Sequence, residues 1–89
     1  MLKKKITIIN KLGLHARAAA KLVALAGHFS SEILLNRNGQ QANAKSIMGV
    51  MMLAITQGTE IEITIDGADE AAALAEIEAF INNRFGESE

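Results

Sequence analysis

Residues 60–65 are Glu-Ile-Glu-Ile-Thr-Ile, the most regular alternation of polar and apolar residues in the chain. Isoleucine occupies positions 61, 63 and 65, so one side of the stretch is apolar and the other is polar. This period of two predicts a β-strand with one face buried and one face in water. Strands of this kind build an antiparallel sheet that helices cover on one side.

A helix is predicted on each side of this strand along the chain. Ser46 is placed to cap a short apolar helix over residues 47–53, and Asp69 is placed to cap a longer helix over residues 70–85. The longer helix has an inner stripe formed by Leu74, Ile77 and Ile81.

The first half of the chain alternates between the two periodicities. They predict, in order, a strand over 3–9, a loop over 10–14, a helix over 16–26 and strands over 31–37 and 40–43. Asn38-Gly39, between the last two strands, is a strong hairpin signal.

The predicted order is therefore strand, helix, strand, strand, helix, strand, helix. It predicts an α+β fold of two layers, in which a four-stranded antiparallel sheet is covered on one side by three helices. A chain of 89 residues fits a single domain with one small core, here residues 1–89. We expect residues 86–89 to form a loose tail.

Composition limits the classes of function. The absence of cysteine excludes disulfides and thiolate metal sites. A formal net charge of -1 gives no general attraction for nucleic acid, and the lack of Trp and Tyr removes a base-stacking platform. The N-terminal residues hold no apolar run long enough for a signal peptide or a membrane span, so we expect a cytoplasmic protein without membrane insertion.

Residues 13–18, Gly-Leu-His-Ala-Arg-Ala, place a histidine where the loop becomes a helix. His15 stands at the predicted N-cap, where Ser, Thr, Asp or Asn is the usual residue. The backbone N–H groups of Ala16, Arg17 and Ala18 point out of the helix end and, with the helix dipole, form an anion site beside the ring. The same dipole disfavours the protonated ring, which leaves a neutral imidazole as a nucleophile.

Arg17 adds a guanidinium whose planar fork suits phosphoryl oxygens. Together these parts predict a site that holds a phosphoryl group on the ring of His15. On spacing alone, the other interpretation is a solvated loop histidine beside an ordinary arginine.

Two separated motifs carry a resemblance to a known family. Residues 13–18 and residues 44–49, Ala-Lys-Ser-Ile-Met-Gly, are similar to the signature pair of HPr, the histidine-containing phosphocarrier family of the phosphoenolpyruvate:sugar phosphotransferase system. The resemblance covers nearly the whole chain, and the predicted order of elements matches the open-faced sandwich of that family.

The resemblance implies a function and its site. His15 would accept a phosphoryl group on Nδ1 from phosphorylated enzyme I and pass it to IIA-type proteins or domains, as a monomer and with no cofactor or metal. Arg17 and the N–H groups of residues 16–18 would support the phosphoryl group. Ser46 would be a regulatory phosphorylation site, because residues 45–49 resemble the segment that the ATP-dependent HPr kinase/phosphorylase recognises.

One residue departs from the family pattern, since Ala18 stands where proline is usual. Proline is tolerated in a first helical turn because its missing N–H would have no partner inside the helix. Alanine keeps that N–H, which we expect to add one donor near the phosphoryl group.

The short helix is too apolar to be buried on all sides. Val50 and Leu53 share the face that we expect to point inward, and Met52 fits either the core or the surface. The remaining apolar residues form a predicted patch for partners: Ile47, Met48 and Met51. We expect further partner contacts around it at Ala20, Lys21 and Lys45.

Other interpretations stay open at this point. Within the family, the chain could serve the nitrogen-related branch of the system. A small ligand-binding regulatory module would instead have a buried pocket or form a dimer, and would accept no phosphoryl group. A nucleic-acid binder would use the lysines at 3, 4, 5, 11 and 21 and show a steep salt dependence, against which the balanced charge argues. His15 and His28 alone do not make a metal site.

Overall fold

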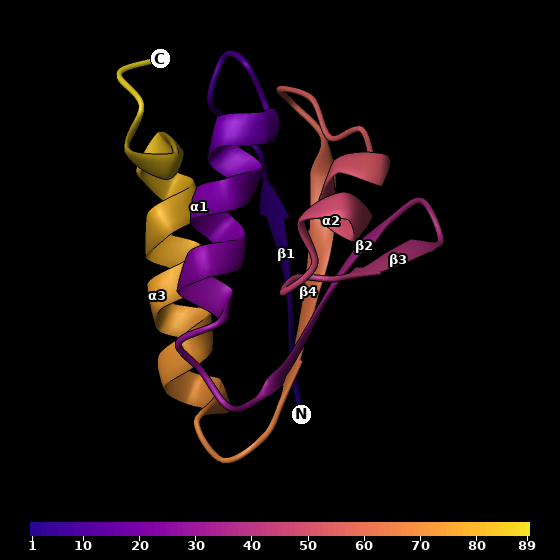
Figure 1. Cartoon of the computed structure of the whole chain (residues 1–89), viewed down its shortest axis with the longest axis vertical. Helices are drawn as coiled ribbons and strands as arrows, with labels where there is room; N and C mark the ends of the chain where they lie inside the picture. The colour runs from indigo at the N-terminus through magenta and orange to yellow at the C-terminus, as the bar shows by residue number, and fades with distance from the viewer.

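The structure, a computed structural model, covers residues 1–89 and has the predicted order of elements (Figure 1). Its elements are β1 (Leu2–Thr7), α1 (Ala16–Ala26), β2 (Glu32–Arg37), β3 (Gln40–Asn43), α2 (Ile47–Met52), β4 (Glu60–Asp66), α3 (Glu70–Asn82) and the 3-10 turn η1 (Arg84–Gly86). The α+β fold is confirmed, and most element ends lie within a residue or two of their predicted positions. None of the helices combines the length and the apolar character that crossing a membrane requires.

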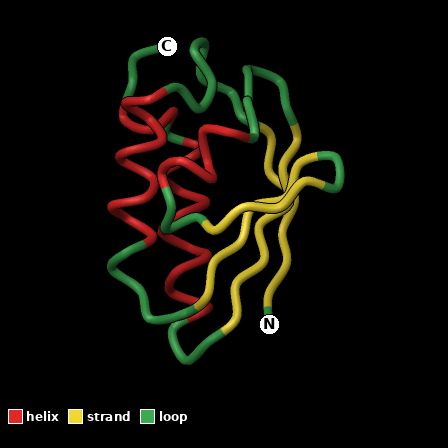
Figure 2. The backbone as a smooth tube through the Cα atoms, turned by 45° about the vertical axis from the view of Figure 1, so that its right-hand side comes forward, coloured by secondary structure: helices red, strands yellow, loops and turns green.

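β4, which contains the alternating residues 60–65, lies inside the sheet. The strand order is β1-β4-β2-β3, and every neighbouring pair is antiparallel. On the inner face Ile61 of β4 lies opposite Ile6 of β1, whereas on the outer face Glu62 lies opposite Lys5. Figure 2 shows the helices gathered on one side of the sheet, so the inner face is the covered one.

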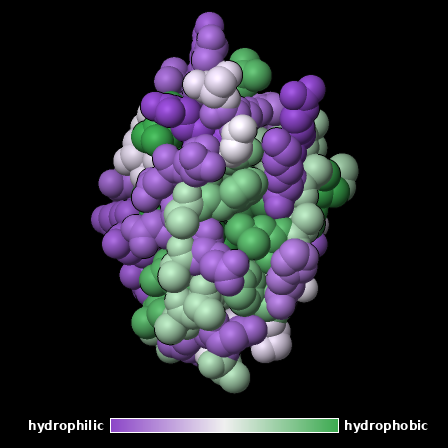
Figure 3. All heavy atoms as spheres, turned by 90° about the vertical axis from the view of Figure 1, so that its left-hand side faces the viewer, coloured by the Kyte–Doolittle hydropathy of each residue, from purple (hydrophilic) through white to green (hydrophobic).

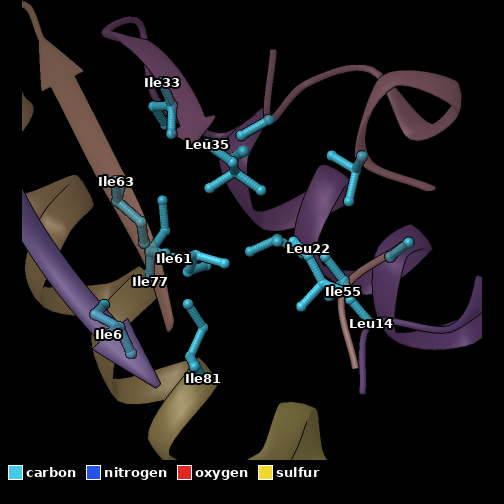
Figure 4. Packing of buried hydrophobic residues seen from close by; sticks show 14 of the residues in the cluster. Ile6, Leu14, Leu22, Ile33, Leu35, Ile55, Ile61, Ile63, Ile77 and Ile81 are labelled. Atoms are coloured by element: carbon cyan, nitrogen blue, oxygen red, sulfur yellow. The ribbon is translucent and has the colours of Figure 1, made fainter. Parts of the chain in front are cut away.

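The hydrophobic core fills the space between the inner face of the sheet and the helices. Figure 4 shows side chains from the sheet, such as Ile6 and Ile63, directed toward Leu22 of α1 and Ile77 of α3. All four are at most 6% exposed. Burial of an aliphatic side chain of this size contributes about 1.5–3 kcal/mol, so the contacts of both long helices with the sheet dominate the stability of the fold.

The buried stripe of α3 differs from the prediction at one position. Ile77 and Ile81 are fully buried, as predicted, but Ala73 rather than Leu74 is the third fully buried residue, and Leu74 is half-buried. The exposed residues of α3 include four alanines: Ala71, Ala72, Ala75 and Ala79. Figure 3, which looks onto the α3 side of the molecule, shows apolar surface between hydrophilic side chains.

The C-terminus of α3 lies before the predicted end near Phe85. Positive φ angles of 56° at Arg84 and 55° at Phe85 end the helical path and turn the chain back toward the core. Phe85 is fully buried, and its ring meets Phe80 edge to face at a centroid distance of 5.5 Å. This aromatic contact fixes the position from which the last residues of the chain leave the core.

Asp69 does not cap α3 with its side chain, contrary to the prediction. Its carboxylate accepts hydrogen bonds from the backbone N–H groups of Ser30 at 2.8 Å and Ser31 at 3.0 Å, and from both hydroxyls. These bonds join the start of α3 to the loop before β2. They lower the pKa of Asp69 from 3.8 to about 2, with the Ser31 hydroxyl as the largest cause.

We expect Asp69→Asn to lower the free energy of unfolding at neutral pH. Because the pKa of Asp69 is depressed in the folded chain, the stability that its charge contributes is present above 3.8 and is lost as pH falls toward about 2. The wild-type and variant stabilities should therefore converge in acid. Urea unfolding measured between neutral pH and pH about 2 tests this, with the exposed Asp66→Asn as control. A stability difference that is independent of pH would contradict it.

Candidate functional site

His15 occupies the N-cap of α1, as predicted. Its backbone is extended, its side chain makes no capping hydrogen bond, and its carbonyl accepts the N–H of Ala19 at 2.8 Å. The N–H groups of Ala16, Arg17 and Ala18 have no hydrogen-bond acceptor. Ala16 and Arg17 are exposed whereas Ala18 is fully buried, so the first two N–H groups are the ones open to an anion from solvent.

The loop before His15 is held against the chain that follows α2. Gly13 has a φ of 64°, and a Cβ there would lie 2.6 Å from the carbonyl oxygen of Ile55. Leu14 donates its N–H to the same carbonyl at 3.0 Å. The buried Asn10 donates from Nδ2 to the carbonyl of Gly13 at 2.7 Å. The backbone that carries His15 is therefore fixed before any partner binds.

Arg17 lies on the first turn of α1, on the exposed side of the site. It lines a hollow of about 260 Å³ together with Lys11, Leu12 and residues 87–89 at the end of the chain. Glu87 and Glu89 also line the hollow, and Nζ of Lys11 lies 3.5 Å from the Glu89 carboxylate. Arg17 is therefore the cationic side chain of the hollow that is not paired within the chain, which suits an anionic group bound at the helix end.

The ring of His15 contacts the C-terminal residues, which the sequence analysis expects to be loose. Nε2 of His15 forms a hydrogen bond with Oε2 of Glu87, and Oε1 of Glu87 accepts from Nδ2 of Asn10 at 2.9 Å. The hydrogen bond from His15 is the largest cause that lowers the pKa of Glu87. Neither Asn10 nor Glu87 is part of a periodic pattern, so sequence reasoning missed both.

Ser46 caps α2, as predicted. Its hydroxyl accepts the N–H of Gly49 at 3.2 Å. Ser46 is exposed and lies in the wall of the largest groove of the surface, about 560 Å³, which runs between β3 and α2. The Ser46 side chain is therefore reached from solvent without any opening of the fold.

The apolar patch beside Ser46 is exposed, and Val50 and Leu53 are buried beneath it, as predicted. Met52, for which the sequence allowed either position, is 78% exposed, so the core-filling interpretation is wrong for this residue. Four residues of this helix are exposed, and we call them the α2 patch: Ile47, Met48, Met51 and Met52. Its contact with partners stays a prediction.

The other predicted partner residues lie on α1 and just before α2. Ala20 and Lys21 are exposed on α1, and Nζ of Lys21 donates to the carbonyl of Phe85 at 3.4 Å. Lys45 is half-buried, and its Nζ donates to the carbonyl of Phe29 at 2.7 Å. Both lysines are thus engaged within the chain. His28 is exposed beyond the far end of α1, so the structure does not bring it to His15.

An open-faced α+β sandwich that presents an imidazole beside unpaired N–H groups at a helix end has the architecture of a small histidine phosphocarrier. Comparisons with known proteins agree. The family model described as the PTS HPr component phosphorylation site matches residues 2–83. The chain belongs to the HPr family, the phosphocarriers of the phosphotransferase system.

Relatives match along the whole chain. The phosphocarrier protein HPr of Cupriavidus necator is 57% identical over 89 residues, which are 100% of each chain. The crystal structure of HPr-C-His from Thermoanaerobacter tengcongensis is 42% identical, with a TM-score of 0.96 and 100% of both chains covered. The crystal structure of an HPr dimer from the same organism has a TM-score of 0.79 at 42% identity, covering 98% of this chain and 100% of the other. Membership of this family favours the phosphocarrier interpretation over the ligand-binding and nucleic-acid interpretations.

We expect Ala18→Pro to stabilise the fold by about 0.4–1 kcal/mol, because proline restricts the unfolded chain and the Ala18 N–H has no acceptor to lose. Ala19→Pro is the matched control, since it removes the hydrogen bond to the His15 carbonyl and should destabilise by about 3 kcal/mol. Urea unfolding of both variants measures the difference. A loss of stability in Ala18→Pro would show that the core around residue 18 has no room for the ring.

Proposed function

We propose that His15 carries the phosphoryl group on Nδ1, accepts it from phosphorylated enzyme I and passes it to IIA-type proteins of sugar transport. The observation that supports this most directly is the position of the ring. His15 is 27% exposed, stands beside the open N–H groups of Ala16 and Arg17, and makes no hydrogen bond through Nδ1.

The transfer needs no group that the two proteins lack. The lone pair of Nδ1 attacks the phosphorus of the donor phosphohistidine, and the donor's P–N bond breaks as its electron pair returns to the donor ring. The proton on Nε2 of His15 stays in place. The N–H groups of residues 16–17 and the guanidinium of Arg17 take up the negative charge on the phosphoryl oxygens.

The openness of the site is part of the mechanism. A carrier must release the phosphoryl group as readily as it accepts it, so tight binding of the phosphorylated form would slow onward transfer. A helix end and one exposed arginine give moderate support at the rim of the molecule. Donor and acceptor proteins bring their own catalytic groups to this rim.

The α2 patch is the proposed docking surface for these partners. Methionine side chains adapt to several partner surfaces, and this patch holds more exposed large hydrophobic side chains than any other helix of the chain. Ala20, Lys21 and Lys45 extend it toward α1. We propose that the chain acts in the cytoplasm as a monomer, since one copy presents both His15 and the patch.

The nitrogen-related branch of the system is the alternative to the sugar branch. Incubation with phosphoenolpyruvate and the enzyme I of each branch, followed by a comparison of the phosphorylation rates, separates the two.

We expect His15→Ala to abolish labelling by enzyme I and radioactive phosphoenolpyruvate, because no other imidazole lies at a helix N-terminus. His28→Ala, the matched control, should be labelled at the wild-type rate. The wild-type label should be lost in acid and kept in base, since protonation of the phosphohistidine ring makes the imidazole a better leaving group and the P–N bond hydrolyses. Label on His15→Ala, or label that survives acid, would refute His15 as the carrier.

We also propose that Ser46 is phosphorylated by an HPr kinase/phosphorylase and that this inhibits transfer to His15. A phosphate there adds a charge of about -1.5 to -2 at the N-terminus of α2, where the dipole tolerates it and the helix is preserved. The same charge stands next to Ile47 and the rest of the α2 patch, so a partner that buries the patch must desolvate it.

We expect Ser46→Asp to keep the fold and to slow phosphorylation of His15 by enzyme I about tenfold, or ~1.4 kcal/mol in the barrier. Asn38→Asp, which adds the same charge on the exposed turn between β2 and β3, should leave the rate unchanged. Ser46→Ala should lose about 0.5–2 kcal/mol of stability and little transfer. Equal transfer rates for Ser46→Asp and wild type, with intact circular dichroism, would leave Ser46 as a helix cap only.

A further inference from the structure

The C-terminal residues place a carboxylate against the ring nitrogen that the proposed transfer does not use. Oε2 of Glu87 meets Nε2 of His15 across 72 positions of sequence, and the Glu87 side chain is only 15% exposed. A fully exposed tail carboxylate would sample many positions. This one is held, so its contact with the ring requires an explanation.

Contacts of the residues before and after Glu87 in the chain hold it in place. Before it, Phe85 is fully buried, and the N–H of Glu87 donates to the carbonyl of Arg84 at 2.9 Å. After it, the carbonyl of Glu89 accepts the N–H of Lys11, and the Glu89 carboxylate lies 3.5 Å from Nζ of Lys11. Residues 85–89 therefore form a strap that is bound to the loop between β1 and α1 and places Glu87 beside the ring of His15.

Asn10 fixes the second oxygen of the carboxylate. Its Nδ2 donates both to Oε1 of Glu87 at 2.9 Å and to the carbonyl of Gly13 at 2.7 Å. Asn10 is fully buried, so this amide links the strap to the loop that carries His15. With Oε1 occupied by Asn10, Oε2 is the oxygen that faces the ring.

We infer that Glu87 is a positioning residue for His15, whose carboxylate holds the ring proton on Nε2, leaves the lone pair on Nδ1 and stabilises the phosphorylated ring. This inference rests on the proposed function, in which Nδ1 is the acceptor. An ionised carboxylate only accepts hydrogen bonds, so the nitrogen that faces it must carry the proton. Hydrogen bonds from His15 and Asn10 lower the pKa of Glu87, which keeps it ionised at neutral pH.

The same contact favours the product of the transfer. When Nδ1 forms its bond to phosphorus and Nε2 keeps its proton, the ring becomes an imidazolium. The acceptor is ionised in both states, but the charged ring adds a coulombic attraction to the carboxylate that the neutral ring lacks. Glu87 thus supports the phosphorylated state more than the free state, without removing or adding a proton.

The test compares Glu87→Gln with Glu76→Gln, which removes the same charge from an exposed position on α3, away from His15 and from the strap. Nitrogen NMR of the unphosphorylated chains above neutral pH reports the ring tautomer of His15. We expect the Nε2–H form alone in wild type and in Glu76→Gln, and a mixture of both tautomers in Glu87→Gln. This readout does not depend on any transfer reaction.

The second measurement is the equilibrium of phosphoryl transfer from enzyme I to each chain. We expect Glu87→Gln to bind the phosphoryl group about five- to tenfold less favourably than wild type, the difference between a charged and a neutral hydrogen bond. Glu76→Gln should match wild type. Unchanged tautomer and equilibrium in Glu87→Gln, or a more favourable equilibrium, would overturn the role of Glu87. If wild type itself accepts no phosphoryl group on His15, the proposed function fails instead.

Discussion

The isoleucine face of β4 must be buried, and the rest of the structure depends on that requirement. β4 has neighbours on both sides in the sheet, and its isoleucine side chains all point to one face. Only elements packed on that face can cover them. Leu22 of α1 and Ile77 of α3 provide that cover. The axis of α1 is therefore set by core packing, and the end of the helix that carries His15 emerges at a fixed place on the rim of the sheet.

The chemistry of the site needs little beyond this placement. Ordinary backbone N–H groups at the N-terminus of α1 form the proposed anion site, and the loop before it is fixed by the close approach of Gly13 to Ile55. The imidazole is then the one reactive group to be oriented. A small domain can carry such a site because the helix end supplies the polar groups without burying any charge.

Local patterns explain how much of this could be predicted from the sequence. The alternation in β4, the Asn38-Gly39 turn, the Ser46 cap and the position of His15 all depend on residues within one turn or strand, and the structure confirms their placement. The cap predicted at Asp69 was wrong, because its partner Ser31 lies 38 positions away in sequence. The contact of Glu87 was missed, because its partner His15 lies 72 positions away. A carboxylate near a helix start resembles a cap, and a polar tail resembles a loose end, until the fold brings a distant partner to them.

The sheet is open, so β1 and β3 are edge strands, and their composition and length decide how readily a second chain can pair with them. An uncovered edge of free N–H and C=O groups invites pairing with a second chain. The edge strand β1 carries three consecutive lysines at positions 3–5, and the other edge, β3, is only four residues long. Charge repulsion at one edge and shortness at the other oppose stacking of copies into extended sheets. The two edges of the sheet therefore resist pairing with further copies, although the outer face between them is uncovered.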